Sequence, residues 1–340
     1  MKRLIIFLFT VLLIFSQAKA SFAANIDVLP TMQSKSNVQD RVWVGTFQLV
    51  WNELMDKVAF GSVRFADGSP DIAVELNKKE FDITDISWKS YYKYLGKISK
   101  NTKKTIEKGI LRKFNEKSDI LDSLDWTPAP KRYVLYAMLK KEFEFSQPFD
   151  KLGTAPFRDM TAEYFGIDKQ SDKSLGQSVN VLFYNSPNDF AVSLPTMSND
   201  EVFIYKTSTT KPFNYIYADM LKKSENYTGK KEFQYIDELK VPNLKFFEEK
   251  EFNELTFMRI KGTQVMIDKA IESVKFEMNN KGVKLKSEAA ITTALTSAEP
   301  NETETPRLFY FDDTFVVFLK EKEKSKPYFA LRVYDISKFE

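Results

Sequence analysis

The stretch that decides the fold covers residues 270–294 and reads AIESVKFEMNNKGVKLKSEAAITTA. Its first part, Ile271–Met278, combines β-branched and aromatic residues and therefore predicts a strand. The character of the chain changes after Gly282. From Val283 to Thr305 it has no large aromatic residue, but it has many small and acidic residues and one proline. Such a segment cannot bury itself, so we expect an exposed loop that any protease would find.

Runs of similar composition predict further strands in the C-terminal half. They are Tyr133–Leu139, Val179–Tyr184, Phe190–Leu194, Glu201–Tyr205, Leu308–Phe311, Thr314–Leu319 and Tyr328–Tyr334. One helix, roughly Asn214–Ser224, interrupts them. The N-terminal half shows helical spacing over Arg41–Val58 and Asn101–Leu121, with turns and short helices expected between them. A helical front half followed by mixed or antiparallel sheets defines the α+β class.

Four blocks of this sequence resemble, in order and spacing, the serpin superfamily over residues 133–335. Serpins end a central strand of their main sheet with Trp, two residues and Pro-Phe, and here Phe145 stands where that Trp would be, followed by Ser146-Gln147-Pro148-Phe149. The second block, Glu238–Phe246, is similar to the family's Pro-Lys-Phe strand. The third is the stretch 270–294, and the fourth matches the two closing strands with Phe311–Leu319 and Lys326–Val333. The resemblance implies one serpin-like domain over residues 41–340.

In serpins the third block leads into the reactive-centre loop, so the resemblance also implies functional residues. The loop hinge would comprise Gly282, Ser287, Glu288, Ala289, Ala290, Ile291, Thr292, Thr293 and Ala294. The scissile bond would lie among Thr296, Ser297, Ala298, Glu299, Pro300 and Asn301. Structural residues at the breach, where the main sheet opens, would be Phe145, Pro148 and Phe149. In the family, cleavage frees the loop to insert as a strand in the main sheet, and the strain released distorts the captured protease.

The hinge departs from the pattern of inhibitory serpins. Where those carry Glu, Gly, Thr and then small residues, this chain has Asn280–Lys286 before its small residues begin. Either four residues are inserted here, or bulky and charged groups oppose insertion of the loop. The front half lacks good matches to the family's shutter serines, and the stretch before Tyr133 is shorter than in a full serpin. We therefore expect a helix or a strand of the main sheet to be missing.

The N-terminus has the order of a secretory signal peptide. Lys2 and Arg3 precede a largely apolar run from Leu4 to Phe15, and small residues follow up to Ala20. A membrane anchor needs about 20 apolar residues, which this run does not supply. We expect residues 1–20 to be removed, with cleavage after Ala23 or Ala24 as alternatives, and the protein to be secreted, periplasmic or extracellular. The polar residues 21–40 show no periodicity and predict a flexible lead-in.

Composition excludes several classes of function. The chain has no His and no Cys, which excludes a Ser-His-Asp hydrolase, a His-ligated metal site, disulfides and a lipoprotein anchor. No Ser-x-x-Lys pair at a helix start and no Gly-rich phosphate loop is present. Without Lys2, Arg3 and Lys19 the basic residues number 47, as do the acidic ones, so no basic surplus indicates a nucleic-acid partner. We expect no catalysis, no metal and no cofactor.

Two hypotheses of function remain after these exclusions. The first is an exported, monomeric protease inhibitor that acts by loop cleavage and insertion. Its scissile region favours proteases that accept small or acidic residues. The second is a non-inhibitory binding or cell-envelope protein that keeps the scaffold and has lost insertion. An enzyme based on carboxylates or lysines is a third class, but pairs such as Asp312 and Asp313 are typical of solvated loops.

Overall fold

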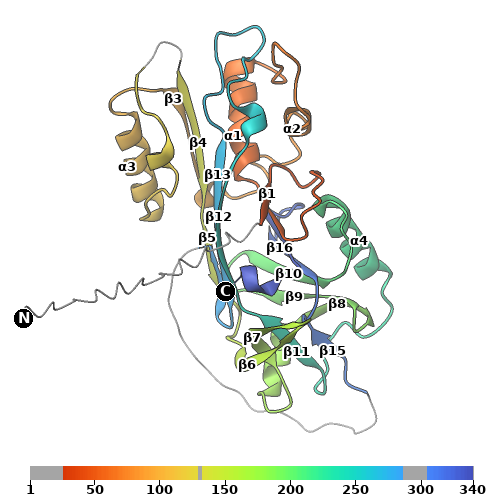
Figure 1. Ribbon diagram of the computed structural model, residues 1–340. Coiled ribbons are helices and arrows are strands. Elements are labelled where there is room, and N and C mark those ends of the chain that lie inside the picture. The colour runs from red at the N-terminus through yellow and green to blue at the C-terminus, as the bar shows by residue number, and fades with distance from the viewer. Residues whose placement is uncertain (1–25, 129–131, 286–304, 340) are drawn as a thin grey trace, which may run out of the picture.

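The structure is a computed structural model that describes residues 26–128, 132–285 and 305–339 (Figure 1). Its largest sheet has seven strands in the order β1-β2-β17-β16-β10-β9-β8. Their bounds are β1 Asp27–Leu29, β2 Arg41–Val44, β17 Phe329–Val333, β16 Phe315–Glu321, β10 Asp200–Lys206, β9 Asp189–Pro195 and β8 Asn180–Ser186. β1 and β2 are parallel, and the other neighbours in this sheet are antiparallel.

Three smaller sheets complete the strand framework. One has the order β15-β11-β7-β6, with bounds β15 Leu308–Tyr310, β11 Glu238–Pro242, β7 Met160–Ile167 and β6 Asp150–Phe157. The next has the order β12-β13-β14-β5, with bounds β12 Leu244–Glu251, β13 Ile271–Asn279, β14 Gly282–Leu285 and β5 Lys141–Glu144. The last is the antiparallel pair β3 Tyr91–Lys97 and β4 Tyr133–Leu139.

Helices cover the edges and faces of these sheets. The α-helices are α1 Thr46–Leu54, α2 Asp71–Leu76, α3 Thr102–Phe114 and α4 Phe213–Asn226. A π-helical turn, Met55–Ala59, extends α1, and short 3₁₀ turns lie at Trp88–Ser90, Leu121–Ser123, Lys173–Ser178, Asn253–Leu255 and Ile336–Lys338. In Figure 1 the long strands β3, β4, β12 and β13 stand upright, with α1 and α3 beside them and the other sheets gathered below.

The core is divided in a way that positions the site. The main cluster fills the space between the sheets and contains stacked aromatic residues such as Phe276 and Phe329, whose rings lie 4.7 Å apart. A second cluster surrounds α1 and includes Trp51, and a third lies between α3 and the face of β4 that carries Tyr136. β4 therefore has α1 on one face and α3 on the other.

The α+β class and most strands predicted from the sequence are confirmed. The prediction for Tyr133–Leu139 matches β4, and Asn214–Ser224 falls within α4. The strands β6 and β7 were not predicted, because Gly153 and Pro156 interrupt the apolar pattern of their hairpin.

Two expectations for the N-terminal half are wrong. Residues 26–40 are not a flexible lead-in, because Ile26, Val28 and Leu29 are buried and β1 pairs with β2. The helix predicted over Arg41–Val58 begins only at Thr46, since Arg41–Val44 are all buried and pair with β17. Residues 21–25 and the predicted signal peptide lie outside the described part of the chain.

A third expectation is wrong in part. Short helices were expected over residues 61–100, and α2 is one of them, but β3 lies at Tyr91–Lys97. Six of the seven residues of β3 are half-buried, so the alternation that marks a strand is absent from its sequence.

Candidate functional site

The short strand β14 lies between β13 and β5. It pairs antiparallel with the end of β13, where Met278 faces Val283, and antiparallel with β5, where Phe143 faces Val283 from the other side. Its first residue must be glycine, because a Cβ on Gly282 would lie 2.3 Å from the carbonyl oxygen of Phe143. β14 therefore holds β13 and β5 apart by the width of one strand.

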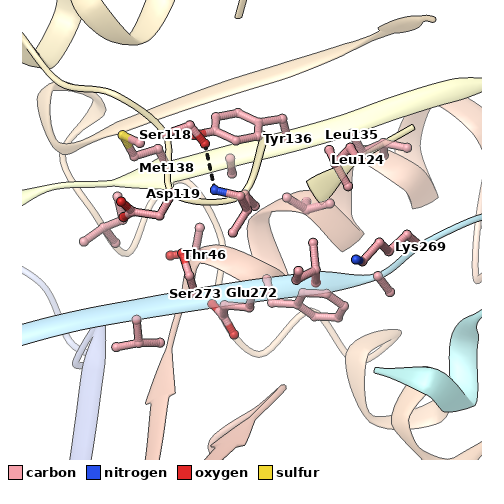
Figure 2. A pocket seen from close by; sticks show the side chains of 18 of the residues that line it. Thr46, Ser118, Asp119, Leu124, Leu135, Tyr136, Met138, Lys269, Glu272 and Ser273 are labelled. Atoms are coloured by element: carbon pink, nitrogen blue, oxygen red, sulfur yellow. Dashed lines mark hydrogen bonds between the residues drawn. The ribbon is translucent and has the colours of Figure 1, made fainter. Parts of the chain in front are cut away.

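Beyond the end of β14, the space between its two neighbouring strands continues as a groove. β4 precedes β5 in the chain and pairs with β3 on its far side, while β13 pairs with β12 on its far side. In the described part of the chain no strand lies between Tyr133–Leu139 and Ile271–Phe276. A cavity of about 680 Å³ occupies this space, and Figure 2 shows β4 and β13 along its two sides. We call this space the strand groove.

Both faces of the strand groove are covered. On one face it is lined by α1, through Phe47, Trp51 and Leu54. On the other face it is lined by the segment Asn115–Trp126, which follows α3 and which we call the strap. Figure 2 shows Ser118, Asp119 and Leu124 of the strap close to Tyr136 and Leu135 of β4. The groove is thus a sheltered position for one extended segment.

Glu272 is the most unusual residue of the groove wall. It lies on β13, is 4% exposed, and neither of its carboxyl oxygens has a hydrogen-bond partner. Burial raises the pKa of the Glu272 carboxyl to about 8. The backbone N–H of Phe47, in the first turn of α1, lowers this pKa slightly without meeting the geometry of a hydrogen bond. At neutral pH the carboxyl is therefore mostly protonated.

A buried ionic cluster fixes β5 to the seven-stranded sheet. The Nζ of Lys141 lies 2.8 Å from Asp200 Oδ1 and 2.5 Å from Glu321 Oε1. Tyr328 donates its hydroxyl to the same Asp200 oxygen at 2.9 Å, and the backbone N–H of Ser87 donates to Glu321 at 3.0 Å. Breaking one partner of such a buried pair is costly, so β5 is a fixed edge of the site.

The predicted breach residues lie at the β14 end of the groove. Phe145 and Phe149 are buried, and their rings pack 5.2 Å apart, while Pro148 is exposed. Their backbones bind the turn between β13 and β14: Phe145 donates its N–H to the Lys281 carbonyl at 2.9 Å, and Phe149 donates to the Asn280 carbonyl at 2.8 Å. These aromatic residues thus support the turn from which β14 starts.

One of the two interpretations of the unusual hinge is wrong for Gly282–Leu285. Bulky and charged groups do not keep these residues out of the sheet, because they form β14. Val283 is fully buried, and Lys284 lies opposite Glu277 on β13 and Glu142 on β5, so each neighbouring strand offers an opposite charge. The other predicted hinge residues, Ser287–Ala294, and the predicted scissile residues, Thr296–Asn301, lie outside the described residues.

The sequence interpretation missed Glu272 and the strap. Glu272 is in phase with Val274, Phe276 and Met278, which are the buried positions of β13. A carboxylate in that phase is a signal that sequence inspection could have found. The strap carries no such signal, because its place over the groove depends on contacts with residues distant in sequence.

Of the comparisons with known proteins, the one with solved structures bears on the fold. No family model matches the chain, and neither does any curated protein. Among solved structures, Serpin48, a highly specific serpin of the insect Tenebrio molitor, matches with a TM-score of 0.51 and 14% identity over 87% of this chain and 92% of that one. Human thyroxine-binding globulin complexed with its hormone matches with a TM-score of 0.48 and 12% identity, again over 87% of this chain and 92% of that chain.

The chain therefore has a serpin-like α+β fold, as the resemblance of its sequence implied. β4 and β5 follow each other along one side of the strand groove, β13 lies along the other side, and β14 occupies the start of the position between them. None of the helices among the described residues is both long enough and apolar enough to cross a membrane.

Proposed function

We propose that this protein is an exported, non-catalytic inhibitor of proteases that is cleaved between β14 and β15 and then fills the strand groove with its own chain. The observation that carries the proposal is β14 itself. Its four residues already lie between β13 and β5, and the groove continues directly from their end. Insertion would therefore extend the existing ladders of backbone hydrogen bonds on both sides of β14, and no new ladder would have to be nucleated.

The register of β14 supports the choice of inserting residues. Continued without a shift, it places residues 287–293 opposite 268–274 on the β13 side and opposite 133–139 on the other side. The latter range is the whole of β4, which has seven residues. Ala289 would share the face of Val283, beside Glu272 and Ala137, where a small side chain fits. The predicted hinge thus matches the groove in length, and its Ala289 suits the position between Glu272 and Ala137.

One observation favours the non-inhibitory alternative. The same register places Lys286 between Lys275 of β13 and Lys140, which links β4 to β5. Like charges directly opposite each other on neighbouring strands are destabilising. If this repulsion stops insertion, the protein is a serpin-like binding or cell-envelope protein whose groove stays unfilled after cleavage.

The segment after β14 is expected to be the first site of proteolysis. Residues 286–306 form the longest late stretch without apolar periodicity, and chains of that kind are cut before packed elements. Limited digestion with an elastase-type protease and peptide mapping of the first nick test this. A first cut at residues 66–70 would count against the loop assignment.

Export is expected to leave a mature chain that begins at Ser21 or within four residues of it. The apolar run of the N-terminus is shorter than the roughly 20 residues that span a bilayer, which favours cleavage over anchoring. Intact-mass measurement on protein from the native host tests this proposal. A retained segment 1–20 would contradict it.

A further inference from the structure

The strap is attached at the β14 end of the groove to the link between β4 and β5. Lys140 lies between these strands, and its Nζ is 3.1 Å from Glu116 Oε1 of the strap. The same Nζ donates to the carbonyl of Phe114, the last residue of α3, at 3.3 Å. These two contacts join this end of the strap to the β4 edge of the groove.

At the far end, a single guanidinium joins the strap to both edges of the groove. Arg132 directly precedes β4, and its Nη1 lies 2.6 Å from Oδ2 of Asp125 in the strap. Its other terminal nitrogen pairs with Asp268, which lies just before β13 on the opposite edge. Nearby, Lys269 donates to the carbonyl of Ser123 in the strap at 3.5 Å. The two edges of the groove are thus tied to each other and to their cover at one point.

Between these ends an ion pair with Lys103 joins Asp122 of the strap to α3, and weaker contacts join the strap to β4. The hydroxyl of Tyr136 on β4 lies 3.2 Å from Ser118 Oγ, and Leu121 is buried against α3. No ion pair between the middle of the strap and β13 occurs in the part of the chain that the structure describes. Release of Arg132 would therefore leave the long Lys269–Ser123 hydrogen bond as the one polar contact between the far end of the strap and the β13 side among the described residues.

We propose that Arg132 is a latch that holds the strap over the strand groove and limits the rate at which the groove is filled. Because the latch joins the flanks of β4 and β13, it fixes their separation at the end of the groove that an entering strand reaches last. The effect of the latch on the rate of filling rests on the proposed function, since only a groove that fills needs a gate. The latch itself rests on the described contacts of Arg132.

The rate of groove filling tests the latch. The variant carries Asp125→Asn and Asp268→Asn in the full mature chain, which removes both carboxylate partners of Arg132 and keeps Arg132 itself. The control is Asp122→Asn, because Asp122 is a strap carboxylate whose ion pair is with Lys103 of α3 and does not cross the groove. After loop cleavage, we expect the rise in thermal stability to develop about tenfold faster in the variant, and the control to behave as wild type. High salt should accelerate wild type towards the variant.

Hydrogen exchange of the intact protein provides a readout that needs no insertion. We expect the amides of residues 118–124 to exchange about tenfold faster in the double variant and at most about twofold faster in the control, which loses one exposed ion pair to α3. Unchanged exchange would overturn the latch, as would faster exchange without faster filling in a protein whose groove does fill. Faster exchange combined with no filling in any variant would leave the latch standing and contradict the proposed function.

Discussion

Glu272→Gln is expected to stabilise the protein strongly above pH 8 and to leave its stability almost unchanged near pH 4.5. The carboxyl has a pKa of 4.5 in the unfolded chain and about 8 in the folded one, so the folded state binds one more proton between these values. Its contribution to stability is fully present below pH 4.5 and is lost as the pH rises through 8. Across that pH window the free energy of unfolding of the wild-type protein should fall by about 5 kcal/mol relative to that of the glutamine variant.

Denaturant unfolding of both proteins at pH 5, 7 and 9 measures this difference. Glu277→Gln is the matched control, because Glu277 lies on the same strand but is half-buried and accepts a hydrogen bond from Asn279 at 3.0 Å. The control should show the wild-type pH dependence. A glutamine variant at position 272 that loses stability with pH as steeply as the wild type would contradict the buried, unpartnered carboxyl.

Cleavage of the loop is expected to raise the melting temperature by well over 10 °C, if the groove fills. An inserted strand gains a ladder of backbone hydrogen bonds on both sides, and each contributes about 1 kcal/mol net. For a chain of this size each kcal/mol raises the melting temperature by about 2–4 °C. Thermal unfolding before and after limited proteolysis measures the gain.

Ala289→Pro is expected to abolish this gain. In the continued register, residue 289 lies in a strand with neighbours on both sides, where a proline lacks the backbone N–H that the ladder needs. Thr303→Pro is the matched control, since it lies beyond the predicted scissile region and stays outside the groove. The control should gain as much stability as wild type. An equal gain in the Ala289→Pro variant would rule out insertion of residue 289 as a paired strand.

The sequence was informative wherever structure is local. β4, β9 and β10 follow from local runs of β-branched, aromatic and other apolar residues, and α4 follows from apolar residues at helical spacing. The class of the fold followed from the order of such runs, and the resemblance to serpins added their arrangement. β14 could not be predicted, because the charges that favour Lys284 in a sheet, Glu277 and Glu142, lie on two other strands.

The site was less predictable than the fold. The strand groove is defined by the absence of pairing between β4 and β13, which no local pattern encodes. The position of the strap depends in part on the contact of its Ser123 with Lys269, which are 146 positions apart in the chain. Glu272 was the exception, since its phase on β13 marks it as buried.

Hydrogen exchange at the edges of the strand groove tests the central claim most directly. The amides of Tyr133–Leu139 and Ile271–Phe276 that face the groove have no strand beside them in the described part of the chain. If cleavage drives residues 287–293 into the groove, these amides should become strongly protected in the cleaved protein while those facing β3 and β12 stay as they were. Groove-facing amides that exchange equally fast before and after cleavage would show that the groove stays empty and would contradict inhibition by insertion.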